Sequence, residues 1–312
     1  MNVVDFLKNS ANKYPQKIAL ISENDSFTFS ELWKLVKDFS LPVELFNQQN
    51  VISLISENSA SFVIAYLGIM NLGKTVHIVS PEISETNLTN QIISSNSSMI
   101  ICSESIFHKI SKFNSIKIPI FQLNDIPKNT NSFSSESNEI AYLIYTSGTT
   151  SEPKGVAINH SIVEFATKNI VDVLKYSNSD VDILPLPLHH SFGLGCLHVS
   201  LFVGSTLILL KNSSDLQNIL DTMKKYNATT LAAVPATLSK FLKFNENNLK
   251  DYFSDIRLVI TNTTKIPIIT IQKFKKIISN GNLATYYGLT EASRSSFMIF
   301  DEHTSFDQSV GK

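Results

Sequence analysis

The 312-residue sequence has only two cysteines, Cys102 and Cys196, and a formal net charge of −1 at pH 7. Two cysteines are too few for a disulfide framework and are typical of a reducing compartment. A chain this close to neutrality lacks the basic excess that accompanies nucleic-acid binding. We therefore expect a small-molecule ligand and no nucleic-acid partner.

Targeting and membrane-spanning signals are also lacking. The N-terminal segment has no basic region followed by an apolar core, so no signal peptide is predicted. The one long apolar stretch, 183–210, contains two prolines and three histidines, and ionisable groups are costly inside a bilayer. This stretch is better explained as two buried strands flanking a site. We expect a soluble cytoplasmic protein without a membrane span.

The length of 312 residues is enough for about two domains, and the 43% of apolar residues is enough for large cores. Helix-like and strand-like periodicities alternate, which predicts an α/β fold with mostly parallel sheets covered by helices on both faces. The Ser/Asn-rich segment 128–139 has few apolar groups and predicts a linker. We expect two αβα sandwich subdomains, 1–139 and 140–312.

Individual elements follow from the same periodicity. Helices are predicted at 3–13, from an N-cap at Ser30 to 39, at 59–70, at 84–94, from 161, and at 215–226. Strands are predicted at 18–21, 51–55, 75–79, 99–102, 140–145, near 183 and 207, at 230–234, and at 257–260.

The most informative segment is 145–156, which reads Tyr-Thr-Ser-Gly-Thr-Thr-Ser-Glu-Pro-Lys-Gly-Val. Small hydroxyl residues and Gly148 precede the cation of Lys154. Such a loop can direct backbone N–H groups, hydroxyls and an ammonium at a polyphosphate. It follows an apolar strand-like run, and α/β sheets place their ligands where strands end. The segment therefore predicts a phosphate-binding loop.

Three other interpretations of this loop are weaker. A Walker loop needs four residues between its glycines, whereas five separate Gly148 from Lys154. The Ser-x-x-Lys pattern of serine β-lactamases is present from Ser151, but neither Ser-Asp-Asn nor Lys-Thr-Gly accompanies it. A solvated turn without a ligand is the third alternative.

The loop closely resembles the phosphate-binding signature of the adenylate-forming superfamily, Thr-Ser-Gly-Thr-Thr-Gly-x-Pro-Lys-Gly, with Ser151 as its one departure. That superfamily includes acyl-CoA synthetases, nonribosomal peptide adenylation domains and firefly luciferase. The resemblance implies that the loop holds the β- and γ-phosphates of ATP. The implied nucleotide-binding residues are Thr146, Ser147, Gly148, Thr149, Thr150, Ser151 and Lys154.

A second motif at 186–194, Leu-Pro-Leu-His-His-Ser-Phe-Gly-Leu, places His190 at the exposed end of a predicted strand. A histidine in an apolar run is by itself more often structural than catalytic. The segment, however, resembles the Pro-Leu-x-His-x-x-Gly-Leu motif of acyl-CoA synthetases, which implies that His190 and Gly193 line the acid site. Amino-acid-activating relatives usually have an Asp there as the counter-charge for the α-ammonium, and His190 cannot supply that charge. An acid without an α-amino group is therefore favoured.

A third motif, Tyr-Gly-Leu-Thr-Glu at 287–291, resembles the superfamily's Tyr-Gly-x-Thr-Glu. A hydroxyl and a carboxylate after a Gly turn suit a phosphate and Mg²⁺, although a tight turn before a helix is the alternative for the motif alone. The resemblance implies that Thr290 contacts the α-phosphate and that Glu291 helps to bind Mg²⁺. It also implies that Tyr287, beside Gly288, stacks on adenine.

Two further positions bear on specificity. Many long-chain and aryl-CoA synthetases have Gly at the position of Tyr286, which opens an acyl tunnel, so the resemblance implies that Tyr286 restricts the substrate to a short or compact acid. Segment 258–267 occupies the place of the family's Gly-Gly-Ala-Pro adenine-binding segment. Asn262, Thr263 and Thr264 replace the small residues there, and Thr263 is the predicted adenine contact.

The resemblance covers essentially the whole chain but only the N-terminal portion of a usual member, so we expect the large N-terminal domain without the C-terminal domain. A truncated chain, one half of a split enzyme and a reduced paralogue are the possible explanations. The ATP and acyl site is expected in 140–312.

The implied reaction is ATP- and Mg²⁺-dependent activation of a small carboxylic acid to an acyl-adenylate, with Lys154, His190, Thr290 and Glu291 as catalytic residues. The acyl group would then pass to the thiol of coenzyme A or of a carrier phosphopantetheine, so an acyl carrier protein is a possible partner. The alternatives are an adenylation domain that loads an amino or aryl acid onto a carrier protein, and a nucleotide-binding module without turnover.

Overall fold

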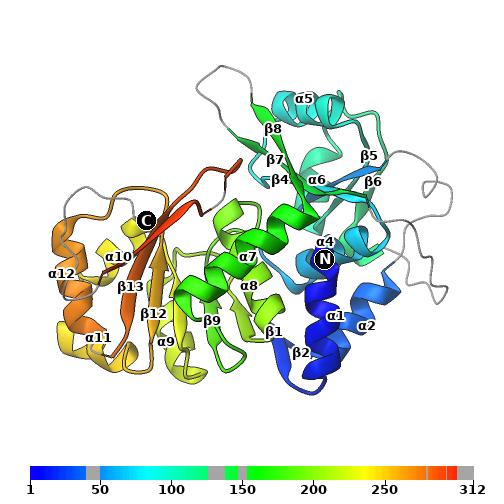
Figure 1. The fold of residues 1–312 in the computed structure, drawn as a ribbon. Coiled ribbons are helices and arrows are strands. Elements are labelled where there is room, and N and C mark those ends of the chain that lie inside the picture. Colours follow the sequence, from blue (N-terminus) through cyan, green and yellow to red (C-terminus); the bar gives the residue numbers. More distant parts are fainter. Residues whose placement is uncertain (40–49, 126–137, 147–152, 279, 293, 301–312) are drawn as a thin grey trace. The chain divides into compact units, whose positions relative to one another are not determined.

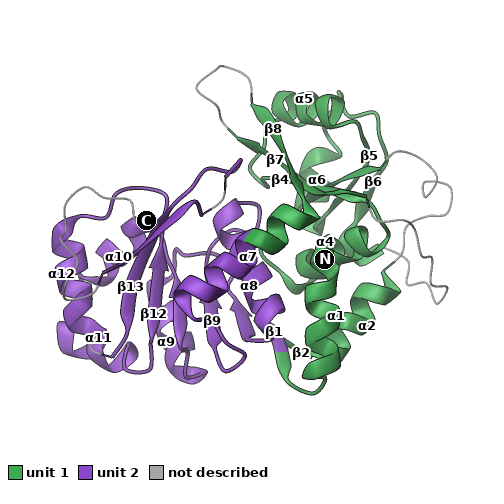
Figure 2. Ribbon diagram, viewed as in Figure 1, with its two compact units in different colours: residues 1–18, 25–165 green, residues 19–24, 166–312 purple. Residues whose placement is uncertain are grey.

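The computed structural model describes residues 1–39, 50–125, 138–146, 153–278, 280–292 and 294–300 (Figure 1). The chain forms two compact units, the first from residues 1–18 and 25–165, the second from residues 19–24 and 166–312 (Figure 2). Most of the predicted linker 128–139 lies outside the described residues. The predicted subdomain limits, 1–139 and 140–312, stay a prediction.

Helices and strands alternate through the described residues, which confirms the α/β class. The helices are α1 (Val3–Lys13), α2 (Phe29–Asp38), α4 (Ala60–Asn71), α5 (Glu85–Ser95), α6 (Glu104–Ile110), α7 (His160–Leu174), α8 (Ser191–Val203), α9 (Leu216–Lys225), α10 (Pro235–Phe241), α11 (Glu246–Tyr252) and α12 (Ile268–Ile277). The strands are β1 (Ile18–Ser22), β2 (Asp25–Thr28), β3 (Val51–Ile55), β4 (Thr75–Val79), β5 (Ser97–Cys102), β6 (Ile120–Gln122), β7 (Ile140–Thr146), β8 (Lys154–Asn159), β9 (Val181–Leu184), β10 (Thr206–Leu209), β11 (Thr230–Ala232), β12 (Leu258–Thr261), β13 (Asn282–Tyr287) and β14 (Ser296–Phe300).

The first unit is built on a six-stranded sheet with the order β6-β5-β3-β4-β7-β8. All neighbours are parallel except β7 and β8, which form an antiparallel pair. Parallel neighbours need a crossover, and helices α4 and α5 provide it between β3, β4 and β5. Every residue of β4 and β5 is buried, as expected for central strands of a sheet covered on both faces.

The second unit contains seven strands of an eight-stranded sheet, in the order β14-β13-β12-β11-β9-β10-β1. The strands from β13 to β1 pair in parallel, and β14 is antiparallel to β13. Strand β1 thus joins this sheet although it is close to the start of the chain. The parallel strands end along one edge of the sheet, which is where an α/β fold places a ligand.

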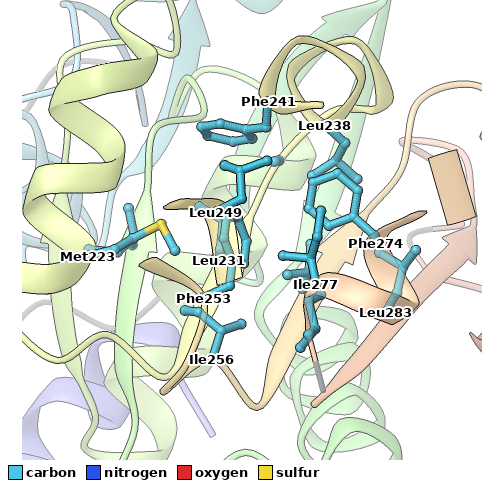
Figure 3. Packing of buried hydrophobic residues seen from close by; sticks show 14 of the residues in the cluster. Met223, Leu231, Leu238, Phe241, Leu249, Phe253, Ile256, Phe274, Ile277 and Leu283 are labelled. Atoms are coloured by element: carbon cyan, nitrogen blue, oxygen red, sulfur yellow. The ribbon is translucent and has the colours of Figure 1, made fainter. Parts of the chain in front are cut away.

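Helices α9 to α12 pack on the second sheet through one cluster of apolar side chains (Figure 3). Three fully buried rings lie at its centre: Phe253 is 5.9 Å from Phe241 and 5.6 Å from Phe274 between ring centroids, and both pairs are close to perpendicular. Edge-to-face pairs of this kind add to the stabilisation from burial alone. The cluster packs the helices tightly against strands β11 to β13, and these strands position the loops that follow them.

Several predicted boundaries were wrong by one or two residues, and two of them have a clear physical reason. Thr28, not Ser30, is the N-cap of α2, because Thr28 Oγ1 accepts a hydrogen bond from the Glu31 N–H at 3.2 Å while the Glu31 carboxylate accepts one from the Thr28 N–H at 2.8 Å. The strand predicted at 230–234 ends at Ala232, because Val234 is the N-cap of α10 and Pro235 opens that helix.

The apolar stretch 183–210 forms β9 and β10, as predicted, but the segment between them is a helix, α8. Nine of the thirteen residues of α8 are buried, so its sequence has no polar stripe that would indicate a helix. Among the described residues, none of the helices combines the length and apolarity needed to cross a membrane.

A buried polar cluster lies inside the first unit, around His77 of β4. The His77 Nδ1 atom is 2.8 Å from Ser53 Oγ, the ring packs edge-on against Tyr145 at 5.1 Å, and Nε2 has no hydrogen-bond partner. Ser95 and Ser97 complete the cluster. Burial lowers the pKa of His77 to about 4, so the side chain is neutral in the folded protein at pH 7.

We predict that the first unit loses stability as the pH falls from 7 to 5. The unfolded chain binds a proton on His77 near pH 6.5 but the folded one does not, so this residue alone should remove about 2 kcal/mol of unfolding free energy over that range. Urea denaturation of His77→Gln should show a weaker pH dependence than the unchanged protein.

The matched control for this prediction is His108→Gln, since the His108 side chain is 71% exposed in the same unit. The unfolding free energy of His108→Gln should change with pH as it does in the unchanged protein. If the unfolding free energy of His77→Gln also changed with pH in that way, the prediction would be contradicted.

Candidate active site

The predicted phosphate loop joins β7 to β8. Its residues Ser147, Gly148, Thr149, Thr150 and Ser151 lie outside the described residues. The two ends of the loop are fixed by the antiparallel ladder, which pairs Thr146 with Lys154. The loop therefore starts at the end of a buried strand, as the sequence indicated, and the Lys154 side chain is exposed.

Strand β7 is held at this end by Tyr145. Its hydroxyl lies 2.5 Å from Ser94 Oγ at the end of α5, and its ring contacts His77. Thr146, the next residue, is half-buried. The last residues of β7 thus have a defined position from which the loop can extend.

The histidine motif forms the junction between β9 and α8. His190 is the N-cap residue of α8, with an extended backbone (φ −109°, ψ 145°) and an exposed side chain. Its N–H donates to the Pro187 carbonyl at 3.2 Å, and its own carbonyl accepts from the Leu194 N–H at 3.0 Å. For the neighbouring His189, burial together with His190 lowers the pKa to about 4. At pH 7 His189 is therefore neutral.

Gly193 explains the tightness of this junction. A Cβ atom at this position would lie 2.3 Å from the Pro187 carbonyl oxygen and 2.9 Å from its carbon, closer than real Cβ contacts allow. The absence of a side chain lets the first turn of α8 lie directly on the backbone of the preceding segment. This contact fixes the position of His190.

Tyr286 on β13 lies against the same helix turn. Its side chain is buried, and its ring is 5.3 Å from that of Phe192 in a perpendicular arrangement and 6.0 Å from that of Phe297 on β14. Burial raises the pKa of Tyr286 above its usual value. Because Phe192 precedes Gly193, the structure brings Tyr286 to the helix turn that also carries the predicted acid-binding residues.

The third motif forms the turn between β13 and the antiparallel β14. Leu289 and Ala292 exchange backbone hydrogen bonds of 3.1 and 3.2 Å that close it. Tyr287 and Glu291 are exposed, whereas Gly288 and Thr290 are half-buried. Glu291 lies in this tight turn, which leads to β14 and not to a helix.

The predicted adenine contact, Thr263, lies two residues beyond the end of β12. It is exposed and has φ 90°, a left-handed backbone that a β-branched residue rarely adopts. Strands β12 and β13 are parallel neighbours. The ends of these two strands therefore lead to Thr263 and to the 287–292 turn from the same edge of the sheet.

Sequence reasoning missed one residue of this region, Arg294. It follows Glu291 by three positions and is buried, with φ 58° and with its guanidinium against α8. The available signal was its rarity, because Arg257 and Arg294 are the only arginines in the sequence.

The chain matches the AMP-binding enzyme family over residues 7–312. Probable CoA ligase CCL5 of Humulus lupulus is 25% identical over 325 residues, which cover 94% of this chain and 58% of the plant protein. A mycosubtilin synthase protein of Bacillus subtilis is 25% identical over 300 residues, covering 92% of this chain and 11% of that protein. Among solved structures, the inhibitor-bound N-terminal domain of FACL13 from Mycobacterium tuberculosis has a TM-score of 0.80 and 20% identity, covering 93% of this chain and 76% of that one.

This protein therefore belongs to the AMP-binding enzyme family, and its fold is that of the N-terminal domain of adenylate-forming enzymes. The match confirms the family predicted from the three motifs. The chain spans 58% of the length of the hop CoA ligase that it resembles.

We predict that Gly193→Ala destabilises the second unit more than Gly195→Ala. Both substitutions add the same methyl group to α8, but at Gly193 it meets a backbone carbonyl, whereas at Gly195 the nearest atom is Nη1 at the end of the Arg294 side chain. The first should cost about 1–3 kcal/mol through overpacking. Urea denaturation measures the difference, and equal costs would show that the Pro187 contact does not constrain the helix.

Proposed function

We propose that this protein provides the ATP and acid sites of a ligase that converts a compact carboxylic acid without an α-amino group into an acyl-adenylate. The observation that carries the proposal is the gathering of Tyr286, Phe192 and Gly193 at one turn of α8, beside the turn that carries Thr290 and Glu291. Family membership supports adenylate formation, and the side chains at this turn of α8 support the choice of acid.

Each predicted residue has a role in this proposal. The phosphate loop and Lys154 hold the β- and γ-phosphates, Thr290 holds the α-phosphate, and the exposed ring of Tyr287 stacks on adenine beside Thr263. His190 orients the acid so that its carboxylate reaches the α-phosphorus. Positioning and charge neutralisation of this kind supply most of the catalysis in phosphoryl-centred reactions.

Glu291 suits a nucleotide-bound Mg²⁺. The described residues contain no group of three or more His, Cys, Asp or Glu arranged to hold a metal. Mg²⁺ is commonly held by one or two carboxylates together with phosphate oxygens, so a single exposed carboxylate in the turn fits this mode. When bound, Mg²⁺ would neutralise phosphate charge, and Glu291 would fix its place.

The acceptor of the acyl group is proposed to be a thiol, either coenzyme A or the phosphopantetheine of an acyl carrier protein. Family relatives of both kinds support this choice. An adenylation domain for an amino acid is the second candidate. It is less favoured because His190 is not an acidic partner for an α-ammonium.

We predict that Lys154→Ala weakens ATP binding about tenfold or more but changes AMP binding little. The lysine is assigned to phosphates that AMP lacks, and a hydrogen bond to a charged group contributes about 1.5–3 kcal/mol. Isothermal titration of the full chain with Mg-ATP and with AMP measures both affinities.

Lys117→Ala is the matched control, since Lys117 is also exposed in the first unit. It should bind both nucleotides like the unchanged protein. Equal losses for ATP and AMP in Lys154→Ala, or no binding of either nucleotide to the unchanged chain, would contradict the assignment.

We predict that Tyr286→Gly shifts the acyl preference toward longer chains. The test uses non-hydrolysable acyl-sulfamoyl-adenosine mimics from acetyl to octanoyl, scored by thermal stabilisation, which is about 2.7 kcal/mol at 100 times the dissociation constant. The neighbouring Tyr287→Gly should weaken all mimics equally, because its ring is assigned to adenine. An unchanged order of preference in Tyr286→Gly would contradict the role of Tyr286.

A further inference from the structure

Among the described residues of the second unit, three charged side chains are buried, and two of them have their hydrogen bonds satisfied within the protein. Asp180 accepts a two-pronged pair of 2.6 Å hydrogen bonds from Arg257. Asp182 accepts hydrogen bonds from the hydroxyls of Ser200, Ser205 and Thr230. Neither carboxylate is therefore left over for the third buried charge, the guanidinium of Arg294.

Arg294 is 5% exposed and makes weak contacts for a cation. Its Nη2 atom donates to the Phe192 carbonyl at 3.3 Å and approaches Cys196 Sγ at 3.7 Å. Its central carbon lies 4.9 Å from the ring centroid of Tyr286, whose side chain is also a hydrogen-bond partner of the guanidinium, and 6.0 Å from the ring centroid of Phe192. The Nε atom is buried without a partner, and within the described part of the chain no ion pair to a carboxylate is formed.

This arrangement is costly for the protein alone. A buried charge normally has a hydrogen-bonded partner of opposite sign, because desolvation of an ion is strongly unfavourable. Cation–π contacts recover only part of that cost. The chain also holds Arg294 at φ 58°, and Gly195 leaves the space that Nη1 occupies, since a Cβ there would lie 2.1 Å from that atom. Such local strain is typical of functional sites.

The position of the guanidinium points to the acid site. Both aromatic rings that it contacts, those of Phe192 and Tyr286, belong to the turn of α8 and the strand that the proposed function assigns to the acid. The Nε–H of Arg294 is the donor without a partner, and a charged N–H donor of this kind makes a strong hydrogen bond to a carboxylate oxygen. A cation here would also repel an α-ammonium.

We propose that Arg294 is a specificity-determining residue that binds a second carboxylate of the substrate, so that the acid activated is a dicarboxylic acid. This inference rests on the proposed function. His190 orients the carboxylate that reacts, and Arg294 holds the other one. The guanidinium contacts α8 between two and six residues beyond His190, which is roughly 3–9 Å along a helix axis. A diacid of about four to six carbons spans that separation.

The test compares matched pairs of acyl-sulfamoyl-adenosine mimics on the full chain: succinyl against butyryl, and glutaryl against pentanoyl. Each pair differs by one terminal carboxylate at equal chain length. The unchanged protein should bind at least one diacid mimic about tenfold more tightly than its partner. In Arg294→Gln this preference should disappear while the monoacid affinity stays within about threefold, and Arg294→Lys should retain part of it.

Arg257→Gln is the control, because it makes the same change at the arginine that already has its carboxylate. It should lower stability and leave the ratio of diacid to monoacid affinity unchanged. A purely structural effect of Arg294→Gln would have that same outcome. Equal binding of both members of each pair by the unchanged protein overturns the role of Arg294 and leaves the proposed function standing. Binding of no mimic at all overturns the proposed function and this inference with it.

Discussion

The pairing rules of buried parallel strands determine most of this structure. A central parallel strand has neighbours on both edges and helices over both faces, so the chain must cross over after each strand and all strands end at one edge of the sheet. In the second unit that edge carries the end of β9 with His190, the end of β12 with Thr263, and the turn after β13 with Thr290 and Glu291. Segments separated by about a hundred residues of sequence are brought together by this constraint alone.

Burial of charge is the second constraint, and the second unit meets it in three different ways. Asp180 has a cationic partner and Asp182 has hydroxyl donors, whereas Arg294 has two aromatic rings, the Tyr286 side chain and one carbonyl. The first two arrangements are complete, whereas the third leaves a donor unused. The contrast singles out Arg294 as the buried charge of this unit, among the described residues, whose hydrogen bonding is incomplete.

The α/β class and most elements follow from the sequence, because central strands such as β4 are short apolar runs between helices with clear caps. Helix α8 was harder to predict, since a helix that is buried on all sides loses its polar stripe. The antiparallel strands β8 and β14 could not be distinguished from loop extensions by periodicity. The three motifs of the site were visible because they are contiguous, whereas the role of Arg294 depends on burial and on missing partners, which are properties of the folded chain.

Strand β1 has a consequence for how the chain acquires its structure. Leu20 pairs with Leu207, so one strand of the second unit is synthesised well before the neighbour with which it pairs. Closing so long a loop is entropically unfavourable, and non-local pairing of this kind slows folding. The growing chain can pair Ile18–Ser22 with the adjacent β2, but the other side of this apolar strand has no partner while the whole six-stranded sheet is being translated. A fragment that starts after β1 would lack the strand that pairs with β10 and would leave that side of β10 exposed.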